Sequence, residues 1–426
     1  MNKNDSQRIC KLLLDMGLEG TEEKTKADVV VINTCSVRQS AENRVFGHLR
    51  DFREMKQKNP RLVICVTGCM PGRDKNGEIR KRLPDVDLFF PISDLYQLPR
   101  WLCELRPEFS CTPDPVDDYL KIKPHRIPGA QAFVSIQTGC NKFCSYCVVP
   151  FARGTEKNRP LADILSEACE LASSGVVEIL LLGQTVNSYQ APDPESFSRS
   201  NPYNNHFAKL LWEINQIPGV SRLHYTGPHP VNMNDETIDA MTLPAHVNFL
   251  HLPVQAGDDE VLRRMNRRYT VAQYLDIIDR VRVKIPSIAI GTDVIVGFCG
   301  ETLEQFERTV ELYERVRFDI CYTARYSQRS GTVASRAFKD DVSETEKRRR
   351  WNVLQEVQER ITHENNQKYF GTQVSVLVER CENGTCFGNS REMKLVRFPS
   401  VENLVGKIVD VKIIKVGTWV MDGECV

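Results

Sequence analysis

Three cysteines near the middle of the chain are spaced closely enough to hold one inorganic group. They are Cys140, Cys144 and Cys147 in the segment GCNKFCSYCVVP, and their pattern is C-x3-C-x2-C. Three thiolates on one short loop can bind three corners of an iron–sulfur cluster and leave one iron open to a substrate or cofactor. Zinc is the alternative, but no fourth Cys or His lies nearby in the sequence. The pattern therefore favours an iron–sulfur cluster with one open position.

Two further cysteines, Cys35 and Cys69, each end an apolar segment of strand length, residues 27–35 and 62–69. A helical pattern precedes each of these strands. Strands that alternate with helices form parallel sheets, and ligands bind at the carboxyl ends of such strands. We therefore expect Cys35 and Cys69 to face one site. The alternative for each is a small buried residue at a strand end.

The middle of the chain alternates strand and helix patterns six times. The strand patterns are residues 132–140, 177–184, 222–230, 248–255, 288–298 and 318–327. Six such units predict an open, partial TIM-like (β/α)6 barrel, whose chemistry belongs at the carboxyl ends of the strands. Gln184 and Gln255 end two of these strands, and Asp293 lies in the fifth.

These patterns divide the chain into four segments and predict an α/β fold. We expect an N-terminal domain with an open parallel sheet over residues 1–105, a proline-rich linker over 106–130, the barrel and a long polar helix over 131–365, and a small β-barrel over 366–426. The last segment is predicted from four strand patterns, residues 372–380, 393–398, 406–416 and 419–425.

Composition excludes several classes of protein. The chain is 41% hydrophobic and 26% charged, and its 56 Lys and Arg residues balance 56 Asp and Glu residues, so bulk charge predicts no nucleic-acid partner. No apolar run of about 18 residues predicts a membrane helix, and no signal peptide precedes the first helix pattern. The 15 cysteines fit a reducing cytoplasm, where grouped cysteines more often bind metal than form disulfides. The scattered ones, Cys381 and Cys386 among them, are expected to be structural or incidental.

The cysteine loop at the mouth of a (β/α)6 barrel resembles the radical S-adenosylmethionine (SAM) superfamily. The resemblance extends along the chain to the radical SAM methylthiotransferase family. It is carried in order by NTCSVR, TGCM, CSYCVVPFARG, LGQTVNSY, GPHP, HLPVQAG, MNRRYT, TDVIVGFCGET and YSQRSGT. That family joins an N-terminal domain, a radical SAM barrel and a C-terminal RNA-binding barrel called TRAM. VNSY, GPHP and CSVRQSAEN are most similar to the MiaB-type branch.

The resemblance implies cofactors and ligands. Two 4Fe–4S clusters are implied: one held by Cys140, Cys144 and Cys147 that binds SAM, and an auxiliary one with Cys35 and Cys69 among its ligands. Tyr146 matches the family's aromatic position near the adenine of SAM; ordinary packing under the loop is the alternative. The implied SAM-binding residues in the barrel are Gln184, Gln255 and Asp293, each of which can bond the ribose or methionine groups or only complete the rim.

The third auxiliary ligand of the family has no counterpart in this sequence. In relatives it lies in a GCQMN-like segment, and aligning Met1 and Asn2 with its last two residues puts the cysteine just upstream of Met1. We expect a truncated or misassigned start, with Cys10 and Cys65 as possible substitutes. Without that ligand, the chain is expected to bind about one cluster. In GFCGET, Cys299 replaces the family's proline.

The branch implies methylthiolation of carbon 2 of N6-isopentenyladenosine next to the anticodon of tRNA, with two SAM molecules. A sibling activity on threonylcarbamoyl-adenosine tRNA or on a ribosomal-protein aspartate, and a catalytically impaired or non-catalytic RNA-binding protein, are the alternatives. The expected partners are the tRNA anticodon loop and an electron donor such as flavodoxin or ferredoxin. The protein is expected to be a monomer, and the sulfur donor is not identified.

Other candidate residues are basic or imidazole side chains. Arg153 and Arg159 are candidates for phosphate or the SAM carboxylate, with solvated arginines as the alternative. His229 and His251 are candidates for general bases or structural histidines. The run 347–350 (KRRR) opens the long helix and either meets RNA or forms a solvated face. From Gln367 the chain has eight Lys and Arg against seven Asp and Glu, so RNA binding there is implied by the resemblance to TRAM and not by charge.

Overall fold

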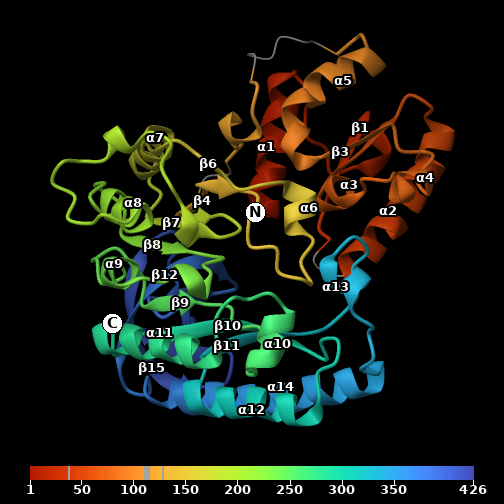
Figure 1. The fold of residues 1–426 in the computed structure, drawn as a ribbon. Coiled ribbons are helices and arrows are strands. Elements are labelled where there is room, and N and C mark those ends of the chain that lie inside the picture. Colours follow the sequence, from red (N-terminus) through yellow and green to blue (C-terminus); the bar gives the residue numbers. More distant parts are fainter. Residues whose placement is uncertain (37–38, 110–115, 127–128) are drawn as a thin grey trace. The chain divides into compact units, whose positions relative to one another are not determined.

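The computed structural model describes residues 1–36, 39–109, 116–126 and 129–426, and of residues 39–41 the backbone only. The chain forms two compact units (Figure 1). Unit 1 comprises residues 1–127, 137–157 and 329–336, and unit 2 comprises residues 128–136, 158–328 and 337–426. The cysteine loop therefore belongs to the same unit as the N-terminal residues.

Unit 1 is built on a three-stranded parallel sheet in the order β1 (Val29–Thr34), β2 (Val63–Gly68), β3 (Leu88–Pro91). Its helices are α1 (Asn2–Asp15), α2 (Gln39–Lys58), α3 (Cys69–Arg73), α4 (Glu78–Lys81), α5 (Leu98–Leu105) and α6 (Val149–Arg153). Val63 and Cys65 pack into one apolar cluster, whereas Ile64 and Val66 pack into another. Because alternate residues of a strand point to opposite faces, the central strand is buried on both sides.

Part of the expected linker packs into the core of unit 1. Tyr119, Leu120 and Ile122 are buried in the same apolar cluster as Val63, around a short 3-10 helix, η3 (Tyr119–Lys121). The Tyr119 hydroxyl donates a hydrogen bond to the carboxylate of Asp5 in α1. The linker predicted from proline content therefore does not include residues 119–122, because they contribute to the hydrophobic core.

Unit 2 contains six parallel strands. The first sheet has the order β4 (Gln131–Ser135), β7 (Glu178–Leu182), β8 (Arg222–Tyr225), and the second has β9 (Phe249–His251), β10 (Ala289–Val296), β11 (Ile320–Arg325). The backbone of Leu223 in β8 bonds residues 245 and 247, directly before β9, which joins the two sheets. This arrangement confirms the predicted open (β/α)6 barrel. Two short strands, β5 (Gln137–Thr138) and β6 (Lys157–Asn158), flank the cysteine loop.

Helices connect the strands of unit 2. They are α7 (Leu161–Ser173), α8 (His206–Asn215), α9 (Asp235–Ala240), α10 (Asp259–Arg264), α11 (Val271–Lys284) and α12 (Leu303–Val316). Both α11 and α12 begin with capping boxes, Thr270 with Gln273 and Thr302 with Gln305, which satisfy the first free backbone N–H groups. Within the described ranges, no helix has the length and apolarity needed to cross a membrane.

The long polar helix α14 (Glu344–Gln367) follows α13 (Val333–Ala337) and packs against α12 (Figure 1). Its basic start is only half exposed, since Arg348 and Arg349 face solvent but the other two residues do not. Lys347 is buried and pairs with Asp340, 2.7 Å away, and buried Arg350 pairs with Glu301 at 2.8 Å. These two side chains are satisfied inside the protein, so the run 347–350 cannot offer four cations to RNA.

The C-terminal segment is a closed five-stranded barrel in the order β12 (Gln373–Glu382), β13 (Thr385–Ser390), β14 (Leu395–Pro399), β16 (Met421–Cys425), β15 (Ile408–Val416). The strand β13 was not predicted. Cys381 and Cys386 lie opposite each other in the β12–β13 pairing and are joined by a disulfide, so of the two roles expected for them, structural or incidental, theirs is structural. We refer to this structure as the small barrel.

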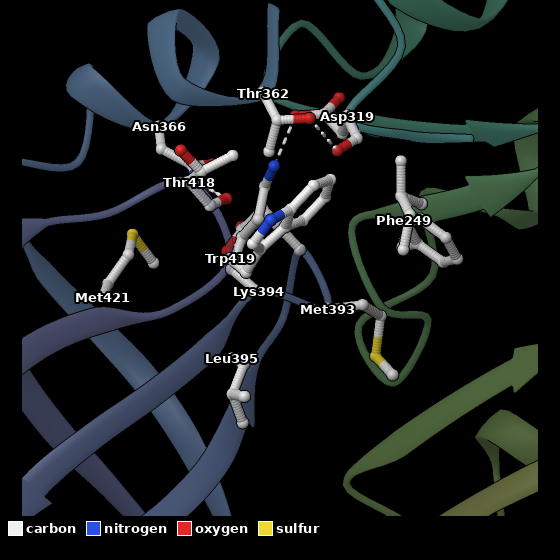
Figure 2. Close-up of a pocket in the computed structure, with 12 residues that line it drawn as sticks. Phe249, Asp319, Thr362, Asn366, Met393, Lys394, Leu395, Thr418, Trp419 and Met421 are labelled. Carbon is white, nitrogen blue, oxygen red and sulfur yellow. Dashed lines mark hydrogen bonds and ion pairs between the residues drawn. The ribbon is translucent and has the colours of Figure 1, made fainter. Parts of the chain in front are cut away.

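The small barrel docks on the amino-terminal ends of the parallel strands. Arg222, the first residue of β8, donates to the backbone carbonyls of Asn389 and Ser375, each at 2.7 Å. Lys394 forms a buried ion pair of 2.7 Å with Asp319, the residue before β11. This pair lines a pocket of about 140 Å³. Figure 2 shows Trp419 beside the pair. The docking face is therefore the end of the sheet opposite to the strand carboxyl ends.

Candidate active site: two groups of cysteines

The loop that carries Cys140, Cys144 and Cys147 closes on itself at a glycine. Gly139 has φ +77°, and a Cβ atom there would lie 2.0 Å from the carbonyl oxygen of Thr155. The Cys140 N–H donates to the carbonyl of Gly154 at 3.2 Å, so the two ends of the loop are held together. Only glycine fits both the backbone conformation and the space at position 139.

The three thiols of this loop lie in a partly enclosed setting. Cys140 and Cys144 are buried and Cys147 is half-buried. The backbone N–H of Lys142 is directed at the sulfur of Cys140, 3.5 Å away, and that of Val149 at the sulfur of Cys147, 3.4 Å away. Such N–H groups stabilise thiolates, which are the ligands that iron–sulfur clusters use.

The donor set fits a cluster better than a single ion. Among the described residues, no group of three or more His, Cys, Asp or Glu side chains is arranged to hold one metal ion. A four-iron cluster keeps its thiolates farther apart than one ion does, and the loop offers sulfur donors alone. The residues present therefore fit the iron–sulfur cluster that the spacing predicted.

Cys35 and Cys69 follow the ends of adjacent strands. Thr34 pairs with Gly68 in the β1–β2 register, and each cysteine is the next residue. The Thr34 hydroxyl donates to the carbonyl of Thr67 at 2.7 Å and accepts from the N–H of Met70 at 3.1 Å. A Cβ on Gly68 would lie 2.4 Å from the carbonyl oxygen of Thr34. Both strand ends are thus held in close contact.

The start of α1 lies at the same end of the sheet. The amide of Asn33 in β1 donates to the carbonyl of Asn2 at 3.0 Å. Burial lowers the pKa of the Met1 α-amino group, and Asp5, Arg153, Cys35 and Cys69 all act on it electrostatically. Cys65, by contrast, is enclosed in the core of the sheet, where burial raises the pKa of its thiol. Cys10 lies half-buried in α1.

Arg73 was not singled out by the sequence, yet it fixes the segment after Cys35. It donates to the hydroxyl of Ser36 at 3.3 Å and to both carboxylate oxygens of Glu42, at 2.9 and 3.0 Å. Both members of the ion pair are almost fully buried. The pair joins α3, which begins at Cys69, to α2, and no local pattern in the sequence could have revealed it.

The two arginines near the loop are internal and do not meet solvent. Arg153 is buried and bonds the carboxylate of Asp5 in α1. Arg159 is buried in unit 2 and bonds the carboxylate of Glu167. Neither is a solvated arginine, so the alternative that the sequence left open is wrong. Each carboxylate partner bonds one nitrogen of a guanidinium group that was a candidate for phosphate.

The barrel candidates lie in unit 2. Gln184 follows β7, and its side-chain oxygen is buried without a hydrogen-bond partner among the described residues. Gln255 has φ +78° and its backbone bonds Asp293 and Ile295 of β10, at 2.8 and 2.9 Å. Asp293 lies inside β10 and not at its end, and its carboxylate is 3.2 Å from Nε2 of His251. Gln255, Asp293 and His251 are therefore neighbours.

Tyr146 and His229 have different surroundings. Tyr146 is half-buried within the cysteine loop of unit 1. His229 is buried in unit 2, its ring accepts from the N–H of Val231 at 3.3 Å, and its backbone exchanges hydrogen bonds with Asn187. These bonds favour a structural role for His229. Cys299 is buried as well.

Comparison with known proteins identifies the family. Two family models match: "Radical SAM superfamily" over residues 134–313 and "Uncharacterized protein family UPF0004" over residues 1–91. The tRNA-2-methylthio-N(6)-dimethylallyladenosine synthase of Thermoanaerobacter sp. (strain X514) is 42% identical, over 100% of this chain and 90% of the relative. Proteins of the same name from Acetivibrio thermocellus and Haemophilus influenzae (strain PittGG) are 40% and 41% identical over 100% of this chain, and 89% and 90% of their own. The chain belongs to this methylthiotransferase family.

A solved structure shares much of the fold of this chain. The radical S-adenosylmethionine methyltransferase TsrM from Kitasatospora setae, solved with cobalamin and a 4Fe–4S cluster, has a TM-score of 0.52 at 13% sequence identity. The match covers 78% of this chain and 66% of that one. At this identity the likeness shows the fold alone. Family membership supports 4Fe–4S clusters and SAM as the cofactors. The cysteine spacing predicted an iron–sulfur cluster, and the family resemblance implied SAM.

Proposed function

We propose that this protein methylthiolates carbon 2 of N6-isopentenyladenosine next to the anticodon in tRNA. The observation that carries the proposal is the placement of both cysteine groups, Cys140, Cys144 and Cys147 on one loop and Cys35 and Cys69 at two strand ends, within the same compact unit. The relatives that match the whole chain are named for synthesis of this modified nucleoside. An unactivated aromatic C–H bond resists polar chemistry, so a radical route suits the reaction.

We assign the candidate residues to two centres, a radical centre at the cysteine loop and a sulfur centre at the auxiliary cluster. Cys140, Cys144 and Cys147 would hold the first cluster. When bound, that cluster and SAM supply a reducing electron and an organic radical. Tyr146 would pack near the adenine, and Gln184, Gln255 and Asp293 would bond the ribose or the methionine part. The unpaired buried oxygen of Gln184 supports this role, because a ligand donor would satisfy it.

Cys35 and Cys69 would provide two ligands of the auxiliary cluster. The contact between the two strand ends supports this assignment, since it holds both residues at one edge of the sheet. Cys65 is a poor ligand because it is enclosed in apolar core. The bonds of Arg73 to Ser36 and Glu42 would keep the Cys35 segment in place when the site is loaded.

The RNA would be bound in part by the small barrel, a TRAM-like domain over residues 366–426. Exposed Trp419 and the pair of Arg380 over the ring of Phe387, 4.4 Å from its centroid, offer surfaces on which bases can stack. A single-stranded anticodon loop lets the target base leave its stack at low cost. We propose a cytoplasmic monomer that takes electrons from a flavodoxin or ferredoxin.

Nucleoside analysis tests the substrate. Protein rebuilt anaerobically with iron and sulfide is given dithionite, SAM and one of three substrates: tRNA with isopentenyladenosine, tRNA with threonylcarbamoyl-adenosine, or the ribosomal protein that carries the target aspartate. The 2-methylthio product should appear only with the first, by mass spectrometry of the digested RNA. Product from either other substrate would assign the protein to a sibling activity. Absence of 5′-deoxyadenosine with all three would overturn the enzymatic proposal.

A further inference from the structure

Arg153 is a buried cation with one unpaired donor. Its side chain is 3% exposed, and its Nη2 donates to Oδ2 of Asp5, whose side chain is 0% exposed. Its Nη1 is buried and has no hydrogen-bond partner among the described residues. A buried N–H without an acceptor loses the hydrogen bonds that it would make with water, which is destabilising. The position therefore requires an acceptor that the described residues do not supply.

Asp5 fixes the guanidinium but cannot satisfy it fully. Its Oδ1 accepts from the hydroxyl of Tyr119, and its Oδ2 accepts from Arg153. The Arg8 guanidinium lies over the Tyr119 ring, 5.0 Å from the centroid, and donates to the carbonyls of residues 119, 120 and 122. Tyr119, which Arg8 holds in place, thus fixes the Asp5 carboxylate, and Asp5 keeps Arg153 in one orientation.

Arg153 and Cys69 lie at the ends of two helices in close contact. A Cβ on Gly72, within α3, would lie 2.0 Å from the carbonyl oxygen of Ala152, within α6. Cys69 is the first residue of α3, and Arg153 is the last of α6. Burial lowers the pKa of Arg153, whereas the charges of Asp5 and then Cys69 raise it, and the net shift is upward. The cation is therefore within electrostatic range of the Cys69 sulfur.

We propose that Nη1 of Arg153 donates a hydrogen bond to a sulfur atom of the cluster bound at Cys35 and Cys69, with Asp5 as its positioning residue. The inference rests on the auxiliary site in the proposed function. Cluster sulfides and cysteine thiolates accept such bonds, and hydrogen bonds to sulfur shift the reduction potential of a cluster upward. Arg153 follows the cysteine loop in sequence, so the loop of the radical centre would itself help set the potential of the sulfur centre.

The competing role for Arg153 is recognition of a phosphate or of the SAM carboxylate. Its almost complete burial disfavours a role in binding a mobile ligand, because a substrate would have to enter behind the ion pair with Asp5. A cluster assembled in place does not have to enter and leave in each turnover. The buried donor is therefore better suited to a resident group than to a substrate.

The test isolates the auxiliary cluster and measures its potential. The background variant Cys140→Ala/Cys144→Ala/Cys147→Ala removes the ligands of the other cluster. The GCQ segment of the family is added before Met1 to supply the third auxiliary cysteine, and this chain is rebuilt anaerobically. Reduction potentials are measured by a redox titration monitored by electron paramagnetic resonance. Arg153→Lys and Arg153→Gln are compared in this background. Arg106→Lys is the matched control, because Arg106 is a partly buried arginine of unit 1 that pairs with Glu108.

The expected result is a shift to more negative potential in both Arg153 variants, larger for Arg153→Gln, and none for Arg106→Lys. Arg153→Lys keeps the charge but has one ammonium group, which Asp5 would retain. Proton electron–nuclear double resonance should also show an exchangeable proton coupled to the reduced cluster, lost in Arg153→Lys. An unchanged potential and an unchanged proton coupling in Arg153→Lys would overturn the hydrogen bond. No iron in the background variant would instead overturn the auxiliary site, and the inference with it.

Discussion

Gly72 in α3 is packed so tightly on Ala152 in α6 that a Cβ at position 72 would lie 2.0 Å from the Ala152 carbonyl oxygen. The contact is between two backbones, so no side-chain rotation can relieve it. Through it, the helix that begins at Cys69 supports the helix that follows the cysteine loop. The close approach therefore keeps the two cysteine groups of unit 1 in a fixed relationship.

Gly72→Ala should separate these two helices. We expect a loss of about 1–3 kcal/mol in the free energy of unfolding, since overpacking at backbone contacts has costs of this size. Iron bound after anaerobic reconstitution should fall as well. Gly47→Ala is the control, because a Cβ there meets nothing within 4 Å and alanine favours the helix α2. Equal behaviour of the two variants would show that the contact is not tight.

Cys144→Ala should abolish reductive cleavage of SAM while leaving the fold intact. The loop would keep two thiolates, which cannot complete the three-cysteine set of this cluster. The measurement is 5′-deoxyadenosine released with dithionite, alongside circular dichroism. Cys169→Ala removes an exposed cysteine in α7 and should cleave SAM like the parent protein. Cleavage retained in Cys144→Ala would assign the cluster to other ligands.

Lys394→Met should destabilise the docking of the small barrel. It leaves the buried Asp319 carboxylate without its cation, although the Ile290 N–H still donates to it at 2.9 Å. Removing one partner of a buried pair costs about 3–5 kcal/mol. Denaturant melts check the loss, and hydrogen exchange should increase at β13 and β14.

The double variant Lys394→Met/Asp319→Asn tests the cause of that loss. Since no unpaired charge remains, part of the stability should return relative to Lys394→Met alone. A double variant whose stability is the simple sum of the two single losses would mean that the ion pair is not coupled. Lys284→Met is a suitable reference, because its pair with Asp239 is exposed and contributes little.

His246 should make stability depend on pH below neutrality. Burial lowers its pKa to about 3, with a bond between Nδ1 and the Val247 carbonyl at 2.7 Å. Between about pH 6.5 and 3 the unfolded chain binds a proton that the folded chain excludes, so stability falls as pH falls, by up to about 1.4 kcal/mol per unit. His246→Asn should flatten this slope in urea melts at pH 7, 6 and 5. His363→Asn, at an exposed histidine, should keep it.

Most of the parallel strands could be predicted because each is a long apolar run between helical patterns. Of the strands that the structure describes, β3, β6 and β13 could not, and β6 has only two residues. β3 is only four residues long, and β13 contains Cys, Gly, Asn and Ser, which have weak strand propensity; its neighbours in the small barrel stabilise it. The segment around Tyr119 was predicted to be part of a linker for a related reason. It is buried because it packs against α1, and no local pattern indicates this.

The cysteine ligands could be predicted from spacing and strand ends, because both are local features. The ion pairs could not. Arg153 meets Asp5 across 148 residues and Lys394 meets Asp319 across 75, so only the folded chain brings the partners together. A local sequence pattern does not show whether an arginine is buried. The sequence therefore did not predict that Arg153, Arg159 and Arg350 are buried and paired with carboxylates.

The attachment of the small barrel to the amino-terminal ends of the strands sets a length requirement on any RNA that it binds. Gln184 and Gln255 lie toward the opposite ends, and a strand of eight residues such as β10 rises about 26 Å. An RNA in contact with the small barrel must reach along the outside of the sheet before one of its bases can arrive beside those residues. A nucleotide or a very short oligonucleotide cannot contact both the small barrel and those residues. The distance between them therefore selects for long RNA, whatever base is recognised.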